Sequence, residues 1–296
     1  MGAFYRLRWP EGKKGAFTLS YDDGCREDFI LAEMMEKYDV KGTFNVIWSR
    51  LWPEDKPDPE KNPIRRNMRP SEFQAFIRRF GDRIEIANHT LTHPVLQTLS
   101  PGQRCYDLIE GRRALEEATG KLVRGFAFSM SHKNADLAME EVALSGAAYV
   151  RGYSVKKNFA FTEGDPRELP ATCHHTVPEE ELTELADSFL SWPDDYRRDG
   201  ALFFVWGHTY EFTNNGDWDK MDRLLRKVSG RDDVLYATCI EIADYIRAWR
   251  ALSFSVDGSA VYNPSAIPVY LKFFPDYGTA GALFRLDPGK ETRLRP

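Results

Sequence analysis

The segment Gly15-Ala-Phe-Thr-Leu-Ser-Tyr-Asp-Asp-Gly24 joins an apolar run to two adjacent carboxylates and a glycine. Its first part, residues 15–21, predicts a buried β-strand that ends directly before the carboxylates. Residues 27–38 follow with apolar side chains at helical spacing. A strand, a polar turn and a helix in this order are typical of one βα unit of a parallel α/β protein.

The same alternation continues to about residue 250. Further strands are predicted at 41–47, 83–87, 123–128, 147–151 and 200–206, and helices at about 71–79, 102–119, 134–145, 179–190, 217–228 and 238–250. Residues 155–178 are expected to be irregular. Seven or so βα units with right-handed crossovers fit a closed or nearly closed α/β barrel.

The pattern changes after residue 252. Residues 253–296 contain short β-like segments separated by Asp-Gly, Asn-Pro and Pro-Gly turns, without helical spacing. We therefore predict two parts, a barrel over 1–252 and a small β appendage over 253–296 that packs on or beside it. The small size of the appendage favours a structural cover over ligand binding or assembly.

Composition narrows the classes of function. Of the 296 residues 42% are hydrophobic, and the net charge of −5 gives no basic surface for nucleic acid or an anionic membrane. The sequence has no apolar run of bilayer length and no apolar targeting region near Met1, so we expect a cytoplasmic protein without membrane contacts. The four cysteines are far apart and are expected to be reduced thiols. A homo-oligomer remains an open alternative.

Asp22 and Asp23 stand at the end of the first predicted strand. The carboxyl ends of the strands are where α/β barrels build their active sites. Adjacent side chains on a regular strand point to opposite faces, but Gly24 lets the chain turn so that both carboxylates can reach one site. A solvated Asp-Gly turn is the alternative that this pair alone leaves open.

His89 and His93 follow the strand predicted at 83–87, within Asn88-His-Thr-Leu-Thr-His-Pro94. Histidines four residues apart on one helical turn can share a metal ion, and neutral imidazole is a common zinc ligand. Pro94 disfavours helix at His93, so we expect a tight turn that leaves the strand. Two loop histidines with ordinary hydrogen bonds are the alternative.

His208 follows the apolar stretch 200–206 and is therefore expected at the same rim of the barrel. Histidine is well suited to proton transfer near neutral pH. Three of the six histidines and two adjacent aspartates thus gather at strand ends, which packing alone does not explain.

The order of these motifs resembles that of the polysaccharide deacetylases with a NodB homology domain, carbohydrate esterase family four. The family motif Thr-Phe-Asp-Asp-Gly is similar to residues 20–24, His-Ser/Thr-x-x-His is similar to residues 89–93, and Leu-x-His is similar to the strand end before His208. The resemblance covers about residues 10–250. It implies a distorted (β/α)7 barrel.

The resemblance also implies roles for these residues. Asp22 would be the general base, His208 the general acid, and Asp23, His89 and His93 the ligands of one divalent metal ion. We expect zinc, with cobalt, nickel or manganese as alternatives. The implied reaction is metal-dependent hydrolysis that removes an acetyl or other acyl group from an N- or O-acetylated sugar or oligosaccharide.

Two family motifs lack a close match. The third reads Arg-x-Pro-Tyr/Phe, whereas this chain reads Arg124-Gly-Phe-Ala-Phe-Ser-Met-Ser131. Either Arg124 keeps the role of the arginine, or the segment corresponds to a Phe-Ala-Tyr-Pro-Tyr-Gly variant with Met130 at the aromatic position, which we favour. Arg151, at the end of another strand, is then the candidate for orienting the base. The fourth motif supplies an aspartate that pairs with the acid, for which Glu211 and Asp165 are candidates.

His174 and His175 form an adjacent pair beside Cys173. We predict that they line the substrate pocket; hydrogen-bonded loop residues are the alternative, and metal ligation is disfavoured because the first site already supplies three ligands. The other pocket candidates are Met130, Arg151, Trp206, Tyr210 and Glu211.

Two rival functions fit the same sequence. Some relatives of this barrel hydrolyse a small non-sugar amide such as allantoin without needing the metal, which an intact metal motif disfavours. A non-catalytic carbohydrate-binding protein would tolerate loss of Asp22 or His208, yet both are present.

Overall fold

The computed structural model describes residues 4–57, 67–130, 139–161, 167–275 and 281–294. Its centre is a parallel sheet with the spatial order β7-β6-β5-β4-β3-β2-β9-β8, and β10 (Val234–Tyr236) pairs with the beginning of β2. The other strands are β2 (Gly15–Asp23), β3 (Gly42–Val46), β4 (Ile84–Asn88), β5 (Gly125–Ala127), β6 (Tyr149–Val155), β7 (Glu168–Ala171), β8 (Cys173–His174) and β9 (Ala201–Gly207).

The sheet closes into a barrel through residues 168–174. Only Thr172 separates β7 from β8, and these two strands pair with β6 on one side and β9 on the other. The Thr172 N–H donates to the carbonyl oxygen of Phe204 at 2.8 Å. With β7 and β8 counted as one interrupted strand, the predicted (β/α)7 barrel is confirmed. The expectation of an irregular segment over 155–178 was wrong here, because Pro170 and a register shift in β6 hide the strand from any local alternation.

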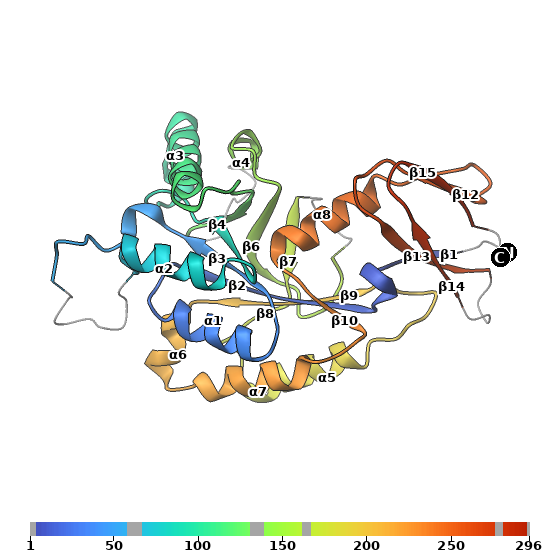
Figure 1. Ribbon diagram of the computed structural model, residues 1–296, viewed down its shortest axis with the longest axis horizontal. Coiled ribbons are helices and arrows are strands. Elements are labelled where there is room, and N and C mark those ends of the chain that lie inside the picture. The colour runs from blue at the N-terminus through green and yellow to red at the C-terminus, as the bar shows by residue number, and fades with distance from the viewer. Residues whose placement is uncertain (1–3, 58–66, 131–138, 162–166, 276–280, 295–296) are drawn as a thin grey trace.

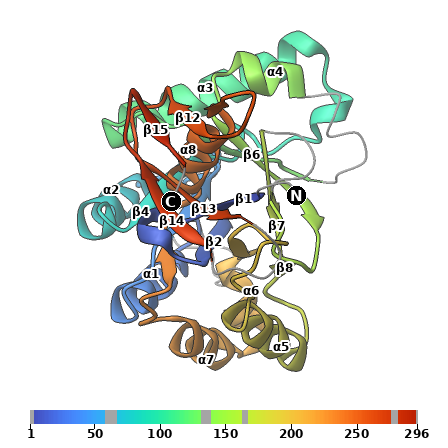
Figure 2. The same ribbon diagram turned by 90° about the vertical axis from the view of Figure 1, so that its right-hand side faces the viewer.

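Helices surround this barrel, with α3 and α4 on one side and α5 and α7 on the opposite side (Figures 1 and 2). They are α1 (Asp28–Lys37), α2 (Pro70–Phe80), α3 (Pro101–Thr119), α4 (Met139–Leu144), α5 (Glu179–Leu190), α6 (Thr209–Asn215), α7 (Trp218–Val228) and α8 (Cys239–Arg250). The strands are covered on both faces, which explains why every residue of β9 and all but the last of β2 are buried. None of the described helices is both long and apolar enough to cross a bilayer.

Two small antiparallel sheets form the predicted β appendage. One has the order β1-β13-β14 and the other β11-β12-β15. Their bounds are β1 (Phe4–Arg8), β11 (Ser253–Phe254), β12 (Ala260–Asn263), β13 (Val269–Phe274), β14 (Ala282–Leu286) and β15 (Lys290–Arg293). The appendage packs against α8 in one apolar cluster and lies at the end of the barrel where β2 begins (Figure 1).

The N-terminal strand β1 belongs to a sheet of the β appendage, which was not predicted from the sequence. It was assigned to the barrel, but it pairs with β13 from Phe4 opposite Phe274 to Arg8 opposite Tyr270. The sheet that follows the barrel in sequence therefore uses residues that precede it. The boundary at residue 252 stays a prediction.

Candidate active site

The end of β2 carries Asp22 and Asp23 into one site. Asp23 has φ = 82° and Gly24 has φ = 69°, so the chain turns through the left-handed region, which aspartate enters more readily than most residues. As a result, Asp22 Oδ2 and Asp23 Oδ1 lie 3.8 and 3.7 Å from the same atom, His89 Nε2. Both carboxylates thus approach one imidazole, although they are neighbours in sequence.

The turn after β4 brings His89 and His93 to Asp23. Asp23 Oδ1 lies 3.7 Å from Nε2 of each histidine, and all three potential ligand atoms lie within 4.8 Å of one another. Thr90 and His93 adopt φ values of 68° and 59°, consistent with a tight turn rather than a helix. Asp107 on α3 holds this turn by accepting from the backbone N–H of Leu91 at 2.8 Å.

The chemistry of these three side chains fits a zinc-type ion. His89 Nδ1 lies 2.9 Å from the carbonyl oxygen of Ala127, so Nδ1 carries the proton and Nε2 keeps its lone pair. Asp23 Oδ1 is buried without a hydrogen-bond partner among the described residues. Burial lowers the pKa of both histidines, that of His93 to about 4, which favours the neutral form that binds metals.

Asp22 is almost completely buried and has polar partners on both oxygens. Asn45 Nδ2 donates to Oδ1 at 2.8 Å, and Arg151 forms an ion pair with Oδ2. Burial alone would raise the pKa of Asp22, but the charge of Arg151, together with His208 and the hydrogen bond from Asn45, lowers it below its usual value. The group is therefore an anion at neutral pH.

His208 lies at the junction of β9 and α6. Its Nδ1 is 3.2 Å from Glu211 Oε2, and its backbone N–H donates to the same oxygen at 3.2 Å. Burial opposes the charged imidazole, but the carboxylates of Glu211, Asp22 and Asp23 raise the pKa of His208 above its usual value. The pKa of Glu211 is lowered: burial acts against this shift, while the hydrogen bond and charge of His208 outweigh it.

The remaining pocket candidates gather between these groups. The guanidinium of Arg151 lies 4.4 Å from the ring centre of Trp206, and the His174 ring lies 4.4 Å from the same indole. The ring of Tyr210 lies 5.2 Å from that of His208. These contacts place the side chains at one rim; their roles toward a substrate stay predictions.

The segment that corresponds to the third family motif lies beside the histidine turn. Ser129 Oγ donates to the carbonyl oxygen of Pro94 at 2.8 Å, and the neighbouring Met130 is half exposed with φ = 54°. Arg124 is far from this role, because it forms two hydrogen bonds with Asp244 on α8, at 2.7 and 2.8 Å. The alternative in which Arg124 orients the base was wrong. Asp165 lies outside the described residues.

Sequence reasoning missed Asn45 and Asp107. Asn45 stands directly opposite Asp22 in the β2–β3 register, and Asp107 lies on α3. A polar residue within an apolar strand is a signal that could have identified Asn45, since its side chain must find a partner inside the barrel. Asp107 carries no local signal, because a polar residue on a helix is ordinary.

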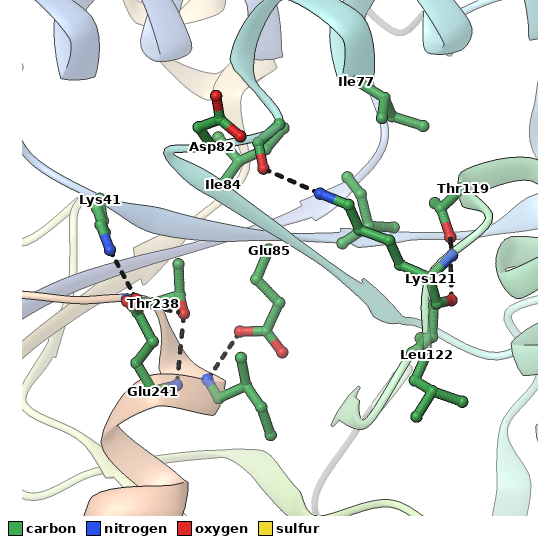
Figure 3. Close-up of a pocket in the computed structure, with 14 residues that line it drawn as sticks. Lys41, Ile77, Asp82, Ile84, Glu85, Thr119, Lys121, Leu122, Thr238 and Glu241 are labelled. Carbon is green, nitrogen blue, oxygen red and sulfur yellow. Dashed lines mark hydrogen bonds and ion pairs between the residues drawn. The ribbon is translucent and has the colours of Figure 1, made fainter.

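A separate pocket of about 270 Å³ opens at the opposite end of the barrel (Figure 3). Its polar groups bind one another: Lys41 pairs with Glu241, Lys121 donates to the Gly81 carbonyl, and Glu85 accepts from the backbone of α8. It lies near the beginnings of β3, β4 and β5, away from the turns that carry the aspartates and histidines. We therefore place the active site at the carboxyl end.

The arrangement defines a parallel (β/α)7 barrel with three ligand-type side chains, a buried anion and a paired histidine at its carboxyl end. Residues 10–149 match the family described as polysaccharide deacetylase, so the predicted resemblance to that family is confirmed. No curated protein matches the chain in sequence.

Many solved structures match this chain, and two of them show the similarity of fold. A protein described as a polysaccharide deacetylase from Mycobacterium smegmatis is 18% identical, with 83% of this chain and 94% of that chain covered and a TM-score of 0.56. The Puue allantoinase is 13% identical, with 82% and 92% covered and a TM-score of 0.59. At these identities the similarity establishes the fold.

Proposed function

We propose that this protein is a metal-dependent hydrolase that removes an acetyl or other acyl group from an N- or O-acetylated sugar or oligosaccharide. The observation that carries the proposal is the contact of Asp22 with both Arg151 and the histidine turn. A buried carboxylate that is held ionised beside a set of three metal-type ligands is suited to activating water. The family match of residues 10–149 supports the same class of reaction.

Asp23, His89 and His93 would hold the metal ion, which supplies Lewis-acid polarisation of the acyl carbonyl when bound. Asp22 accepts the proton of the attacking water, since its lowered pKa keeps it ionised at neutral pH. A backbone N–H beside Met130 is a candidate donor to the developing oxyanion.

His208 delivers a proton to the leaving group. Because Nδ1 faces Glu211, the nitrogen available for this transfer is Nε2. The raised pKa of His208 keeps the imidazole protonated further toward neutral pH. An amine leaving group needs that proton more than an alkoxide does, so we favour N-deacylation.

The test measures acetate release from acetylated sugars together with bound metal. Chelator treatment should abolish turnover and zinc or cobalt should restore it, while His89→Ala should lower both metal content and rate, the rate by about a thousandfold. Asp219→Asn, an exposed carboxylate on α7, is the control and should behave as wild type. Full activity in a metal-free sample would contradict the proposal.

Allantoin belongs in the same substrate panel. The structural similarity to an allantoinase concerns the fold, but it makes a small cyclic amide the alternative substrate to exclude. Ring opening of allantoin without acetate release from any sugar would replace the deacylase proposal with that alternative. Sugar binding by both wild type and Asp22→Asn, with no turnover by either, would favour a binding protein.

A further inference from the structure

Glu211 faces two imidazoles besides that of His208. Its Oε2 lies 3.6 Å from His174 Nε2 and 3.3 Å from His175 Nε2. These three ligand atoms lie within 4.8 Å of one another, and within the described part of the chain only the Asp23 group shares that property. With His208, three imidazoles lie around this one carboxylate oxygen, which has only two lone pairs to accept hydrogen bonds.

The two separations that involve Glu211 match those between ligands of a bound zinc ion. Bonds of about 2.0–2.2 Å in a tetrahedral arrangement place neighbouring ligand atoms about 3.3–3.6 Å apart. The two distances from Glu211 Oε2 fall within this range. Two imidazoles and one carboxylate suit zinc, cobalt or nickel, whereas calcium and magnesium prefer oxygen ligands.

His175 provides an independent observation. Its side chain is 0% exposed, and neither ring nitrogen has a hydrogen-bond partner among the described residues. The ring packs against both Tyr21 and Phe212, with ring centres 5.5 and 4.0 Å away. A buried imidazole without a partner is costly, and a cation at Nε2 would remove that cost.

The neighbouring backbone is shaped around this ring. A Cβ atom at Gly207 would lie 1.9 Å from His175 Nδ1, so only glycine allows the approach. His174 is oriented by its shorter contact with Thr176, in which Nδ1 lies 2.7 Å from the hydroxyl oxygen. The Thr176 backbone N–H also donates to Nδ1 at 3.3 Å, so Nδ1 is the acceptor and Nε2 carries the proton that faces Glu211. A metal ion at Nε2 would replace that proton, as metal binding to imidazole does in general.

We propose that His174, His175 and Glu211 bind a second divalent transition-metal ion, with zinc the best fit. The site is separate from the Asp23 group and does not depend on the proposed reaction. It reverses our expectation that these histidines only line the pocket. Because Glu211 Oε2 is also the partner of His208 Nδ1, an ion here would compete with the acid for its carboxylate. Zinc beyond one equivalent is therefore expected to slow turnover.

The experiment counts metal ions on the untagged full chain. Chelator-stripped protein is dialysed against increasing free zinc, and bound zinc is measured by elemental analysis. The expected values are two ions for wild type, one for His175→Ala, one for His93→Ala and none for the double variant. Cobalt titration should show two steps of visible absorption, of which His175→Ala removes one.

Two further variants keep the test decisive. His174→Gln alters a more exposed position and should also lose one ion, even if His175→Ala fails to fold. Cys173→Ala is the matched control and should retain two, because this buried thiol is next to His174 in sequence but is not one of the three side chains of the ligand group. A wild type that binds a single zinc lost in His93→Ala, or a His174→Gln variant that retains two, would overturn the proposal.

Discussion

Asp22 and Glu85 are carboxylates on two strands of the same barrel, one at each end of it. Asp22 lies at the carboxyl end of β2 against Arg151, whereas Glu85 lies near the beginning of β4 in the pocket of Figure 3. Both side chains are buried, and burial by itself would raise the pKa of each. The net result is opposite: the pKa of Asp22 falls below its usual value, and that of Glu85 rises to about 7.

The difference lies in the partners. Glu85 accepts hydrogen bonds from neutral groups, namely Thr43 Oγ1 at 2.8 Å, Tyr149 OH at 3.0 Å and the Ile240 N–H at 2.8 Å. Asp22 has a buried guanidinium instead. Hydrogen bonds from neutral donors do not offset the desolvation of Glu85, whereas a facing positive charge offsets that of Asp22. Asp22 therefore depends on Arg151 to stay ionised and act as a base.

Arg151→Met should remove the difference in pKa between Asp22 and Glu85, and it has the largest expected effect on activity. Without the cation, Asp22 should behave like Glu85: its pKa rises, and the base is protonated at neutral pH. We expect kcat/KM to fall about 10²–10⁴-fold, with the acid limb of the pH profile moved to higher pH. Arg151→Lys, which keeps a charge, should recover part of the rate. Activity near wild type in Arg151→Met would contradict this account of Asp22.

Glu211→Gln tests His208, the other titrating group of the site. Activity is measured with one equivalent of zinc. His208 is active when protonated, and activity is lost as pH rises through its raised pKa. Removing the Glu211 charge lowers that pKa, so the alkaline limb should move to lower pH. We also expect a rate loss of about 10–100-fold, as for other partners of a catalytic histidine. An alkaline limb at its wild-type position would show that Glu211 does not tune His208.

Asn45→Ala has a smaller expected effect, because it removes a neutral donor and leaves Arg151 in place. The lost hydrogen bond to Asp22 Oδ1, 2.8 Å in the structure, should raise the pKa of Asp22 slightly. We expect about a tenfold loss of kcat/KM and a small shift of the acid limb to higher pH. A loss as large as that of Arg151→Met would mean that hydrogen bonding, rather than charge, keeps Asp22 ionised.

The sequence predicts the parts of the fold that depend on local patterns. The strand over 15–21 and the helix over 102–119 are visible from apolar runs and helical spacing, and the helix ends at Gly120 in the left-handed region. The closing strand at 168–174 has no such pattern. It is defined by pairing with β6 and β9, which are adjacent to it only after the barrel has formed.

The candidate site divides in the same way. The motifs at Asp22 and His89 are short, and recognising them requires no knowledge of the fold. The partner of Asp22 is Arg151, 129 positions away, and only the end of a strand suggested it. The convergence of His174 and His175 on Glu211 depends on how the closing strand meets α6, so the sequence suggested only a pocket at the place where we propose a metal site.

Glu85→Gln tests the amino end of the barrel and should leave kcat/KM almost unchanged. The pKa of Glu85 is 4.5 in the unfolded chain and about 7 in the folded protein. Between pH 4.5 and 7 the folded state therefore keeps a proton on Glu85 that the unfolded state has lost. Wild-type stability should therefore fall as pH rises from about 4.5 to 7 for this group, while the glutamine variant lacks that loss.

Urea unfolding of wild type and Glu85→Gln at pH 5 and pH 8 measures this loss. The difference in unfolding free energy between the two proteins should change by about 1–2 kcal/mol in favour of the variant at the higher pH. The full shift would correspond to more, but the pocket admits water to the carboxylate. A difference independent of pH would mean that the neutral donors suffice to ionise Glu85. The contrast with Asp22 would then rest on something other than the charge of Arg151.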